Sequence, residues 1–219
     1  MVPFQDKSSI VMTGSSQSGK TFLLRDILLH ADQMFQTPPT ICIFVFTHWQ
    51  EAYESIRKKW GDRVLFTQRI PEESQVEAIM RGHKHGVFVA DDKCDQVEKN
   101  PFFRNLLCRL GHHCRMSSFC LLQDANFTGK ASSALKKNFH VTIVMRSPRE
   151  RSFVRALALQ TGDYRCLMHA YDDAVKEKYG YICIDLHPGA DPEYRYRTNI
   201  VPSDKHHCVV YKPKKEEDK

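Results

Sequence analysis

The sequence lacks any apolar run that approaches the ~20 residues of a membrane-spanning helix. Residues 1–7 also lack the basic and apolar regions of a secretory signal. The eight cysteines follow no disulfide framework, and no internal repeat is visible. We therefore expect neither a membrane protein nor a secreted disulfide scaffold, but a protein of a reducing cytosol or nucleus.

Zinc-binding spacing is missing as well. Cysteine and histidine gather in two places, but neither group shows a C-x₂-C or H-x₃-H spacing. The groups are Cys108, His112, His113 and Cys114, and His206, His207 and Cys208. We do not predict a structural zinc site from them.

The composition is typical of a globular domain. Apolar residues make up 42% of the chain and charged residues 26%, and 32 basic against 26 acidic side chains give a net charge of +6. This mild excess permits a polyanionic partner. We expect one domain over residues 1–211, without room for a fused nuclease, and a charged, disordered tail over residues 212–219.

Strand-like and helix-like patterns alternate along the chain. The predicted strands cover residues 9–13, 41–46, 63–66, 86–90, 118–122, 141–145 and 181–185, with an edge strand over 194–200. The predicted helices cover residues 21–33, 50–60, 72–81, 100–110, 130–137, 147–160 and 163–180. Ser147, Pro148 and Glu150 have the spacing of a capping box. The alternation favours an α/β fold with a largely parallel sheet.

A phosphate-binding loop follows the first predicted strand and opens the first predicted helix, which is the context that this motif requires. Its two glycines let backbone N–H groups surround phosphates, and the helix dipole adds to the attraction. Lys20 is expected to reach the β and γ phosphates of ATP, and Thr21 to hold Mg²⁺. The residues of this Walker A motif are Gly14, Ser15, Ser16, Gln17, Ser18, Gly19, Lys20 and Thr21.

Two carboxylates, Asp91 and Asp92, end the apolar strand over 86–90, as in a Walker B motif. Asp91 is expected to hold the water shell of Mg²⁺, and Asp92 to orient and polarise the attacking water. Asp92 is one methylene shorter than the glutamate found in many such ATPases. The alternative is a helix cap with a solvated neighbour. Gln123, which ends the strand over 118–122, can sense the γ-phosphate or its water, because ligands of open α/β sheets lie at this edge.

The order of these motifs, with the segment Leu110 to Ser117 between them, resembles the FtsK/HerA superfamily. It is most similar to viral genome-packaging ATPases of the poxvirus type, in the compact form of Polinton/Maverick and adintovirus elements. The resemblance covers about residues 8–201, including Tyr181 to Leu186 and Tyr194 to Ile200. It implies a RecA-like P-loop NTPase of the ASCE type with an antiparallel C-terminal edge. It also implies that the Gln123 strand lies between the Walker A and Walker B strands.

The same resemblance implies an ATP- and Mg²⁺-dependent translocase of double-stranded DNA, acting as a homo-oligomeric ring of five or six subunits at a capsid vertex or portal-like protein. Assembling capsids in the host nucleus or cytoplasm are the expected location. Such rings use a cation from the neighbouring subunit, for which Arg115 is our first choice, ahead of Arg109 and Arg146. Sequence-independent DNA contacts are expected from Lys130, Lys136 and Lys137.

Two other functions fit parts of the pattern. A small-molecule P-loop kinase shares the length and the early phosphate loop, but it does not need the second acid, and no arginine-rich lid is evident. A non-hydrolysing, nucleotide-gated scaffold is the other alternative, and the complete set of Lys20, Thr21, Asp91 and Asp92 disfavours it.

Overall fold

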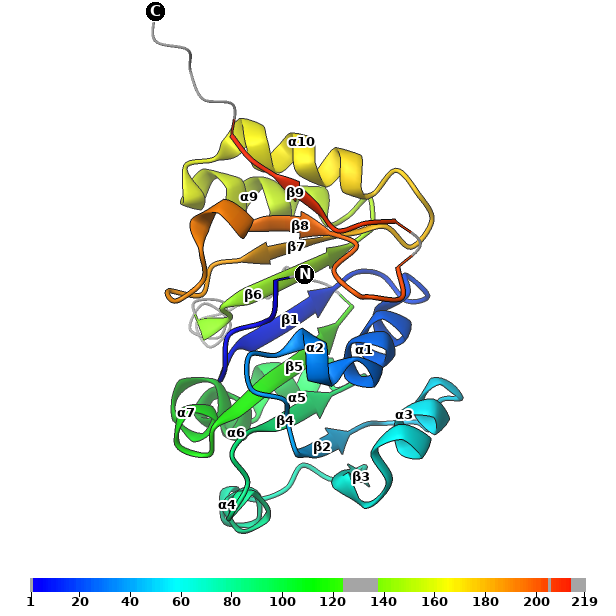
Figure 1. Ribbon diagram of the computed structural model, residues 1–219, viewed down its shortest axis with the longest axis vertical. Helices are drawn as coiled ribbons and strands as arrows, with labels where there is room; N and C mark the ends of the chain where they lie inside the picture. Colours follow the sequence, from blue (N-terminus) through cyan, green and yellow to red (C-terminus); the bar gives the residue numbers. More distant parts are fainter. Residues whose placement is uncertain (1, 124–137, 205, 214–219) are drawn as a thin grey trace, which may run out of the picture.

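The computed structural model describes residues 2–123, 138–204 and 206–213. In these residues nine strands form one sheet in the order β3-β2-β4-β5-β1-β6-β7-β8-β9 (Figure 1). The six strands from β3 to β6 run parallel, and β7, β8 and β9 are antiparallel. The strands are β1 (Ser9–Thr13), β2 (Ile41–Val45), β3 (Val64–Thr67), β4 (Gly86–Ala90), β5 (Met116–Leu122), β6 (Val141–Met145), β7 (Tyr181–Asp185), β8 (Tyr196–Thr198) and β9 (Val209–Tyr211).

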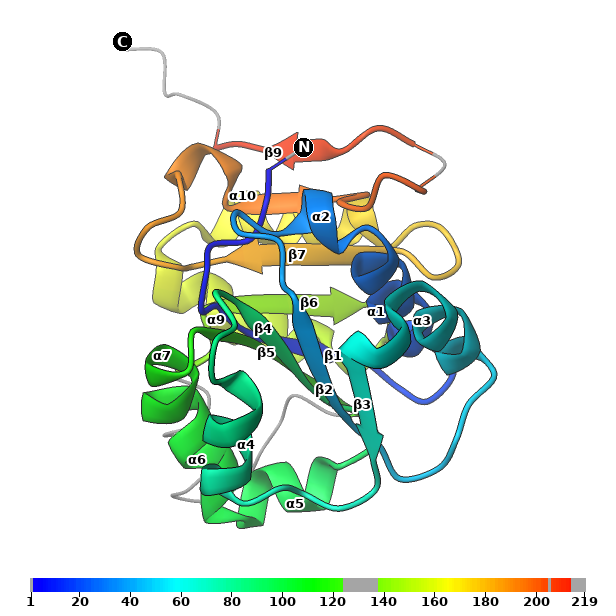
Figure 2. The same ribbon diagram turned by 60° about the horizontal axis from the view of Figure 1, so that its bottom comes forward.

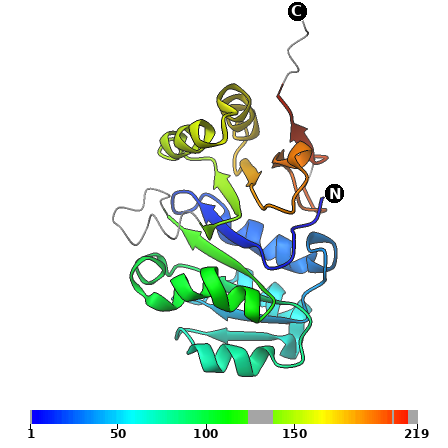
Figure 3. The same cartoon turned by 90° about the vertical axis from the view of Figure 1, so that its left-hand side faces the viewer.

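Helices cover both faces of this sheet (Figures 2 and 3). One face carries α1 (Lys20–Leu29), α2 (Ala31–Met34) and α3 (Ala52–Trp60), followed by a short 3-10 turn, η1 (Gly61–Arg63). The other face carries α4 (Glu73–Met80), α5 (Cys94–Lys99), α6 (Pro101–Asn105), the π-helical η2 (Leu106–Leu110), α7 (Gly111–His113), α9 (Arg151–Thr161) and α10 (Tyr164–Ala174). A last 3-10 turn, η3 (Pro192–Tyr194), precedes β8.

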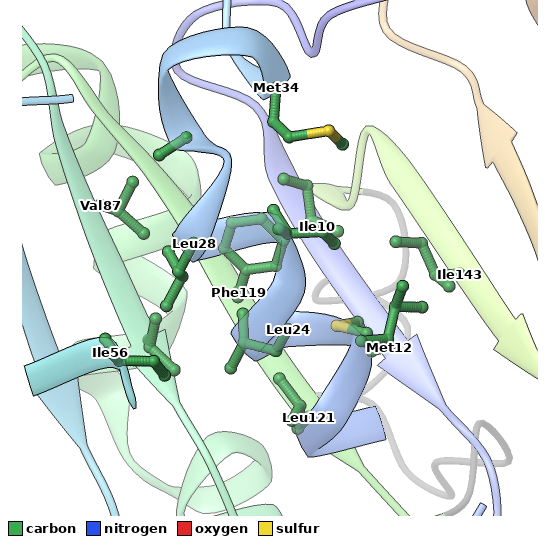
Figure 4. Close-up of a cluster of buried hydrophobic side chains, with 14 of the residues drawn as sticks. Ile10, Met12, Leu24, Leu28, Met34, Ile56, Val87, Phe119, Leu121 and Ile143 are labelled. Carbon is green, nitrogen blue, oxygen red and sulfur yellow. The ribbon is translucent and has the colours of Figure 1, made fainter. Parts of the chain in front are cut away.

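The central strands are apolar throughout because helices cover them on both sides. Alternate residues of one strand therefore enter different cores. Phe119 and Leu121 of β5 lie against Leu24 and Leu28 of α1 (Figure 4), whereas Cys120 faces the helices of the opposite layer. The predicted α/β class and the antiparallel C-terminal edge are both confirmed.

Several local predictions differ from the structure. The helix predicted over 21–33 is divided into α1 and α2. The helix expected from Ser147 begins at Arg151, after a turn over residues 148–150. The Ser147 carbonyl accepts hydrogen bonds from Glu150 N–H and from the Tyr171 hydroxyl at this turn. The next helix ends at Ala174, well before Gly180. The strand expected at the edge is β8, but β9 pairs with it and lies outside it. The helix predicted over 130–137 lies outside the described residues.

The antiparallel part of the sheet contains a buried ion pair. Arg197 of β8 donates from Nη2 to Oδ2 of Asp185 at 2.9 Å, and both side chains are almost fully buried. Arg197 Nη1 also donates to the carbonyl of Val2 at 3.1 Å. These bonds join β7, β8 and the start of the chain. Removing one partner of such a pair leaves an uncompensated buried charge, which is strongly destabilising.

Three histidines lie close together near the N-terminal end of β1. The ring of His140 lies 4.8 Å from that of His187 and 6.1 Å from that of His112, measured between centroids. The backbone N–H of Ser9 donates to Nδ1 of His140 at 3.2 Å, so the neutral ring carries its proton on Nε2. Burial, followed by the two neighbouring histidines, lowers the pKa of His140 to about 4.

The folded state should therefore become less stable as the pH falls from about 6.5 to about 4. Over this range His140 takes up a proton in the unfolded chain but stays neutral in the folded protein. We expect His140→Gln to reduce this loss of unfolding free energy by about 1–2 kcal/mol. Urea unfolding at several pH values measures it. His169→Gln, which changes an exposed histidine of α10, is the control. An unchanged pH dependence in His140→Gln would contradict the assignment.

Candidate active site

Sheet topology brings three predicted motifs together at the carboxyl ends of parallel strands. β5 lies between β1 and β4, and all three strands run in the same direction. The phosphate loop follows β1, the acid pair follows β4 and Gln123 follows β5, so the three segments end side by side. The predicted strand neighbours of the Gln123 strand are confirmed.

Two glycines give the phosphate loop its shape. Gly14 has φ 148°, and a Cβ added to it would lie 2.8 Å from Cβ of Met145 in β6. Gly19 has φ 98° and directly precedes α1. Both backbone conformations favour glycine. The loop therefore lies directly on the end of β6, with its last residue at the N-terminus of a ten-residue helix.

Lys20 folds back over its own loop. Its Nζ donates to the carbonyls of Gly14 at 2.5 Å and Ser15 at 2.9 Å. The N-terminal N–H groups of α1 and this ammonium group converge on one region of the loop. Such a convergence attracts the oxygens of a di- or triphosphate.

The first acid of the pair is deeply placed. Asp91 is only 3% exposed, and its Oδ2 accepts hydrogen bonds from the Thr21 hydroxyl at 3.1 Å and from the Tyr53 hydroxyl at 2.8 Å. Burial raises the pKa of this carboxyl, and the two hydroxyl donors oppose that rise. The carboxylate is thus held in a fixed orientation beside the phosphate loop.

The second acid is exposed and has an unusual backbone. Asp92 has φ 56°, which few residues except glycine, asparagine and aspartate adopt. Its carbonyl accepts a hydrogen bond from the Thr47 hydroxyl at 2.6 Å. The amide of Gln123 lies 3.4 Å from Oδ1 of Asp92. Left-handed backbone of this kind is often found at functional sites, and here the carboxylate that it carries lies beside Gln123.

These side chains surround a cavity of about 320 Å³. It is lined by Ser16, Gln17, Ser18, Gly19, Lys20, Thr21, Phe22, Gln50, Asp91, Asp92, Leu121 and Gln123. The wall combines a cation and helix N–H groups for phosphate with carboxylates for a metal or a water molecule. A polyphosphate can therefore lie along the loop with its last phosphorus toward Asp92 and Gln123.

The residues present fit Mg²⁺. A buried carboxylate and a hydroxyl, 3.1 Å apart, are hard oxygen ligands. Mg²⁺ is usually bound through one or two protein groups, with phosphates and waters completing its shell. Thr21 and Asp91 would hold it, as the sequence predicted, once a nucleotide supplies the phosphates.

The predicted arginines lie in different places. Arg115 is exposed just before β5, at the opposite end of that strand from Gln123. Arg109 pairs with Glu73 at 2.9 Å. Arg146 follows β6 at the phosphate-loop edge and donates to the carbonyl of Lys176 at 3.2 Å. The lysines predicted to contact DNA, Lys130, Lys136 and Lys137, lie outside the described residues.

Sequence reasoning missed Tyr53, Thr47 and Gln50. Thr47 and Gln50 lie between β2 and α3, and Tyr53 lies in the first turn of α3. This part of the chain lies beside β4 because β2 pairs with β4. No motif marks them. The one available signal was that a parallel strand next to the Walker B strand must also end at this edge.

No protein-family model matches this chain, and no curated protein does. Solved structures do resemble it. The DNA-packaging ATPase B204 from Sulfolobus Turreted Icosahedral Virus is 14% identical with a TM-score of 0.53, and the match covers 97% of this chain and 99% of that one. The genome-packaging NTPase B204 from Sulfolobus turreted icosahedral virus 2, in complex with ATP-gammaS, is 11% identical with a TM-score of 0.52, covering 94% and 97%.

At these identities the likeness concerns the fold. The chain has a RecA-like P-loop fold with a largely parallel sheet and an antiparallel edge, as the sequence predicted. No helix in the described ranges is long and apolar enough to cross a membrane.

The contact between Gly14 and Met145 can be tested. Gly14→Ala should lower the affinity for ATP at least about tenfold, because the new methyl group displaces the loop from β6. Fluorescence titration with a labelled ATP analogue measures this. Gly82→Ala is the matched control, since Gly82 also has a left-handed φ of 86° but no atom near its added Cβ. Equal ATP affinity in the two variants would argue against this loop as the binding site.

Proposed function

We propose that this protein is an ATP-driven translocase of double-stranded DNA that packages a viral or virus-like genome into a capsid. The observation that carries the proposal is the convergence of Lys20, Thr21, Asp91, Asp92 and Gln123 on one cavity at the carboxyl ends of three adjacent parallel strands. This set provides for phosphate binding, metal binding and activation of water together.

The geometry supports hydrolysis of the γ-phosphate. Lys20 and the N–H groups of α1 hold the β and γ phosphates, and Thr21 with Asp91 orients the metal. Thr21 and Asp91 would hold Mg²⁺, which would neutralise charge on the phosphate oxygens when bound. Asp92, exposed in the cavity, accepts the proton of a water that attacks the γ phosphorus, while the bond to the bridging oxygen breaks and ADP leaves. Gln123, beside Asp92, donates from its amide to this water or to the γ-phosphate.

The packaging role is drawn from the fold likeness. B204 is described as a DNA-packaging ATPase, and its match with this chain covers nearly the full length of both proteins. A chain of the same length and fold, with the hydrolytic residues in place, supports the same class of activity here. Membership of the FtsK/HerA superfamily, and of its poxvirus-type branch, is part of the proposal.

A ring is proposed because the two ends of the parallel strands carry different groups. The nucleotide cavity lies at the carboxyl ends of the strands, and Arg115 lies at the opposite end of β5. Around Arg115 a second cavity of about 700 Å³ is also lined by Arg81, Lys84 and Arg109. A head-to-tail interface would bring this basic edge toward the neighbour's triphosphate, and closure of such contacts gives a ring.

The remaining partners follow from that assignment. The net charge of +6 suits phosphate contacts that do not read sequence, and Lys130, Lys136 and Lys137 are the proposed DNA contacts. We place the ring at a capsid vertex or portal-like protein, in the nucleus or cytoplasm of the host cell.

The first test is ATP hydrolysis by the purified protein with and without double-stranded DNA. We expect DNA to stimulate phosphate release, and DNA affinity to fall steeply with salt, with a slope of log K against log salt of about −0.9 for each phosphate contact. A small-molecule kinase would not respond to DNA. A rate of ATP hydrolysis that DNA does not change, or DNA binding that depends on one sequence, would contradict the proposed translocase function.

The second test mixes two inactive variants. Asp92→Asn should bind ATP but hydrolyse it at least about 100-fold more slowly, because the amide cannot accept a proton. Asparagine tolerates the left-handed φ of 56°, so the backbone is kept. Arg115→Ala should lose about 10³-fold or more if the guanidinium acts on the neighbour's phosphate.

In a random one-to-one mixture of these variants, about one quarter of head-to-tail interfaces combine an intact Asp92 with an intact Arg115. Hydrolysis should therefore return in part, and each variant alone is the control. Full activity of Arg115→Ala alone would remove Arg115 from the mechanism. Mixed rings of proven composition that stay inactive would move the role to Arg109 or Arg146.

A further inference from the structure

The hydroxyl of Tyr53 reaches the first acid from a part of the chain that no motif marks. Tyr53 lies in the first turn of α3, and its hydroxyl donates to Oδ2 of Asp91 at 2.8 Å. Both side chains are buried, at 0% and 3% exposure. A buried tyrosine hydroxyl on a buried carboxylate forms a charge-assisted bond that solvent cannot replace.

Packing fixes the direction of this hydroxyl. The ring of Tyr53 stacks on Phe66 at 5.9 Å and lies 4.7 Å from the ring of Phe44, between centroids. Phe46 and Trp49 contact it edge-on at 5.7 and 5.5 Å. These rings come from β2, β3 and the segment after β2, so the tyrosine is held by three parts of the fold before it reaches Asp91.

We propose that Tyr53 is a positioning residue for the Mg²⁺ ligand Asp91, an inference that rests on the proposed function. Tyr53 and Thr21 both donate to Oδ2, so two hydrogen bonds from two different helices hold one oxygen of the carboxylate. The other oxygen, Oδ1, is left to accept hydrogen bonds from water on the metal. Without the Tyr53 hydroxyl, the carboxylate is free to rotate away from this orientation.

The charges around Asp91 make such a clamp necessary. Asp92 is the next residue and repels the carboxylate, whereas Lys20 attracts it toward the phosphate loop. Thr21 holds only the side of Asp91 that faces α1. Tyr53 supplies a second hydrogen bond from α3, so the orientation of Asp91 does not depend on Thr21 alone.

The segment containing Tyr53 also holds the second acid. The Thr47 hydroxyl donates to the carbonyl of Asp92 at 2.6 Å, and the Thr47 carbonyl accepts from Gln68 Nε2 at 3.1 Å. Gln50 lines the nucleotide cavity. Residues 47–53 thus contact both carboxylate-bearing residues and the cavity, which makes the β2–α3 segment the second support of the site, beside α1.

The test compares Tyr53→Phe with the parent protein by fluorescence titration of a labelled ATP analogue, once with EDTA and once with Mg²⁺. The substitution removes only the hydroxyl and keeps the ring in its aromatic cluster. We expect unchanged affinity in EDTA, within about twofold, and a loss of about tenfold in the affinity gained on adding Mg²⁺, as for other groups that orient a metal ligand. The Mg²⁺ concentration for half-maximal hydrolysis should rise to a similar extent.

Tyr171→Phe is the matched control. Tyr171 is also a buried tyrosine, but its hydroxyl donates to the Ser147 carbonyl, away from the metal ligands. It should leave both titrations unchanged. A double variant provides a further readout: in an Asp91→Asn background, Tyr53→Phe should cause no additional loss of the Mg²⁺ effect, because the hydroxyl acts through that carboxylate.

Each result decides one point. Equal Mg²⁺ effects in Tyr53→Phe and the parent would overturn the positioning role, and so would an equal loss in EDTA and in Mg²⁺, which indicates a structural role alone. Additive losses in the double variant would also overturn it. The parent protein separates the two failures: a parent that does not bind ATP removes the proposed function and this inference together. In a parent that binds ATP, a failed Tyr53→Phe test overturns only the inference.

Discussion

The hydrogen bond between the Thr21 hydroxyl and the Asp91 carboxylate depends on a constraint of the whole sheet. The two residues are 70 positions apart and belong to segments that follow β1 and β4, which are not neighbours because β5 lies between them. Strands spaced about 4.8 Å apart leave about 10 Å between β1 and β4. The phosphate loop and α1 span that gap over the end of β5, and Gln123 at that end completes the cavity between them.

The site is supported from two further directions. On one side, Met145 of β6 lies under Gly14, so β6, the parallel strand that borders the antiparallel half of the sheet, positions the phosphate loop. That half is held in turn by the buried pair of Arg197 and Asp185. On the other side, the aromatic cluster around Tyr53 fixes the acid pair. The candidate nucleotide cavity therefore lies between β6 on one side and a buried aromatic cluster on the other.

The two ends of the sheet have opposite chemistry. The carboxyl ends of the strands form the cavity with its two carboxylates, and the backbone of Asp92 is left-handed there. This end suits a magnesium nucleotide. The opposite edge carries Arg81, Lys84, Arg109 and Arg115 around a single cavity. In the proposed ring, the basic end of one subunit would face the phosphates of a nucleotide bound at the opposite end of its neighbour. This difference between the two ends is the argument for the proposed ring.

The sequence by itself determined the elements whose information is local. The phosphate loop could be identified because its glycines, lysine and flanking strand and helix are consecutive, and the acid pair and Gln123 because each directly follows an apolar strand. The tertiary structure alone decided the contacts of Tyr53 and Thr47 with residues about forty positions away, since only strand pairing brings them together. It also decided where α9 starts, at a turn in which the Ser147 carbonyl accepts a hydrogen bond from the distant Tyr171 hydroxyl. The outermost strand β9 could not be predicted either, because its three residues are too few for a periodic pattern to be visible.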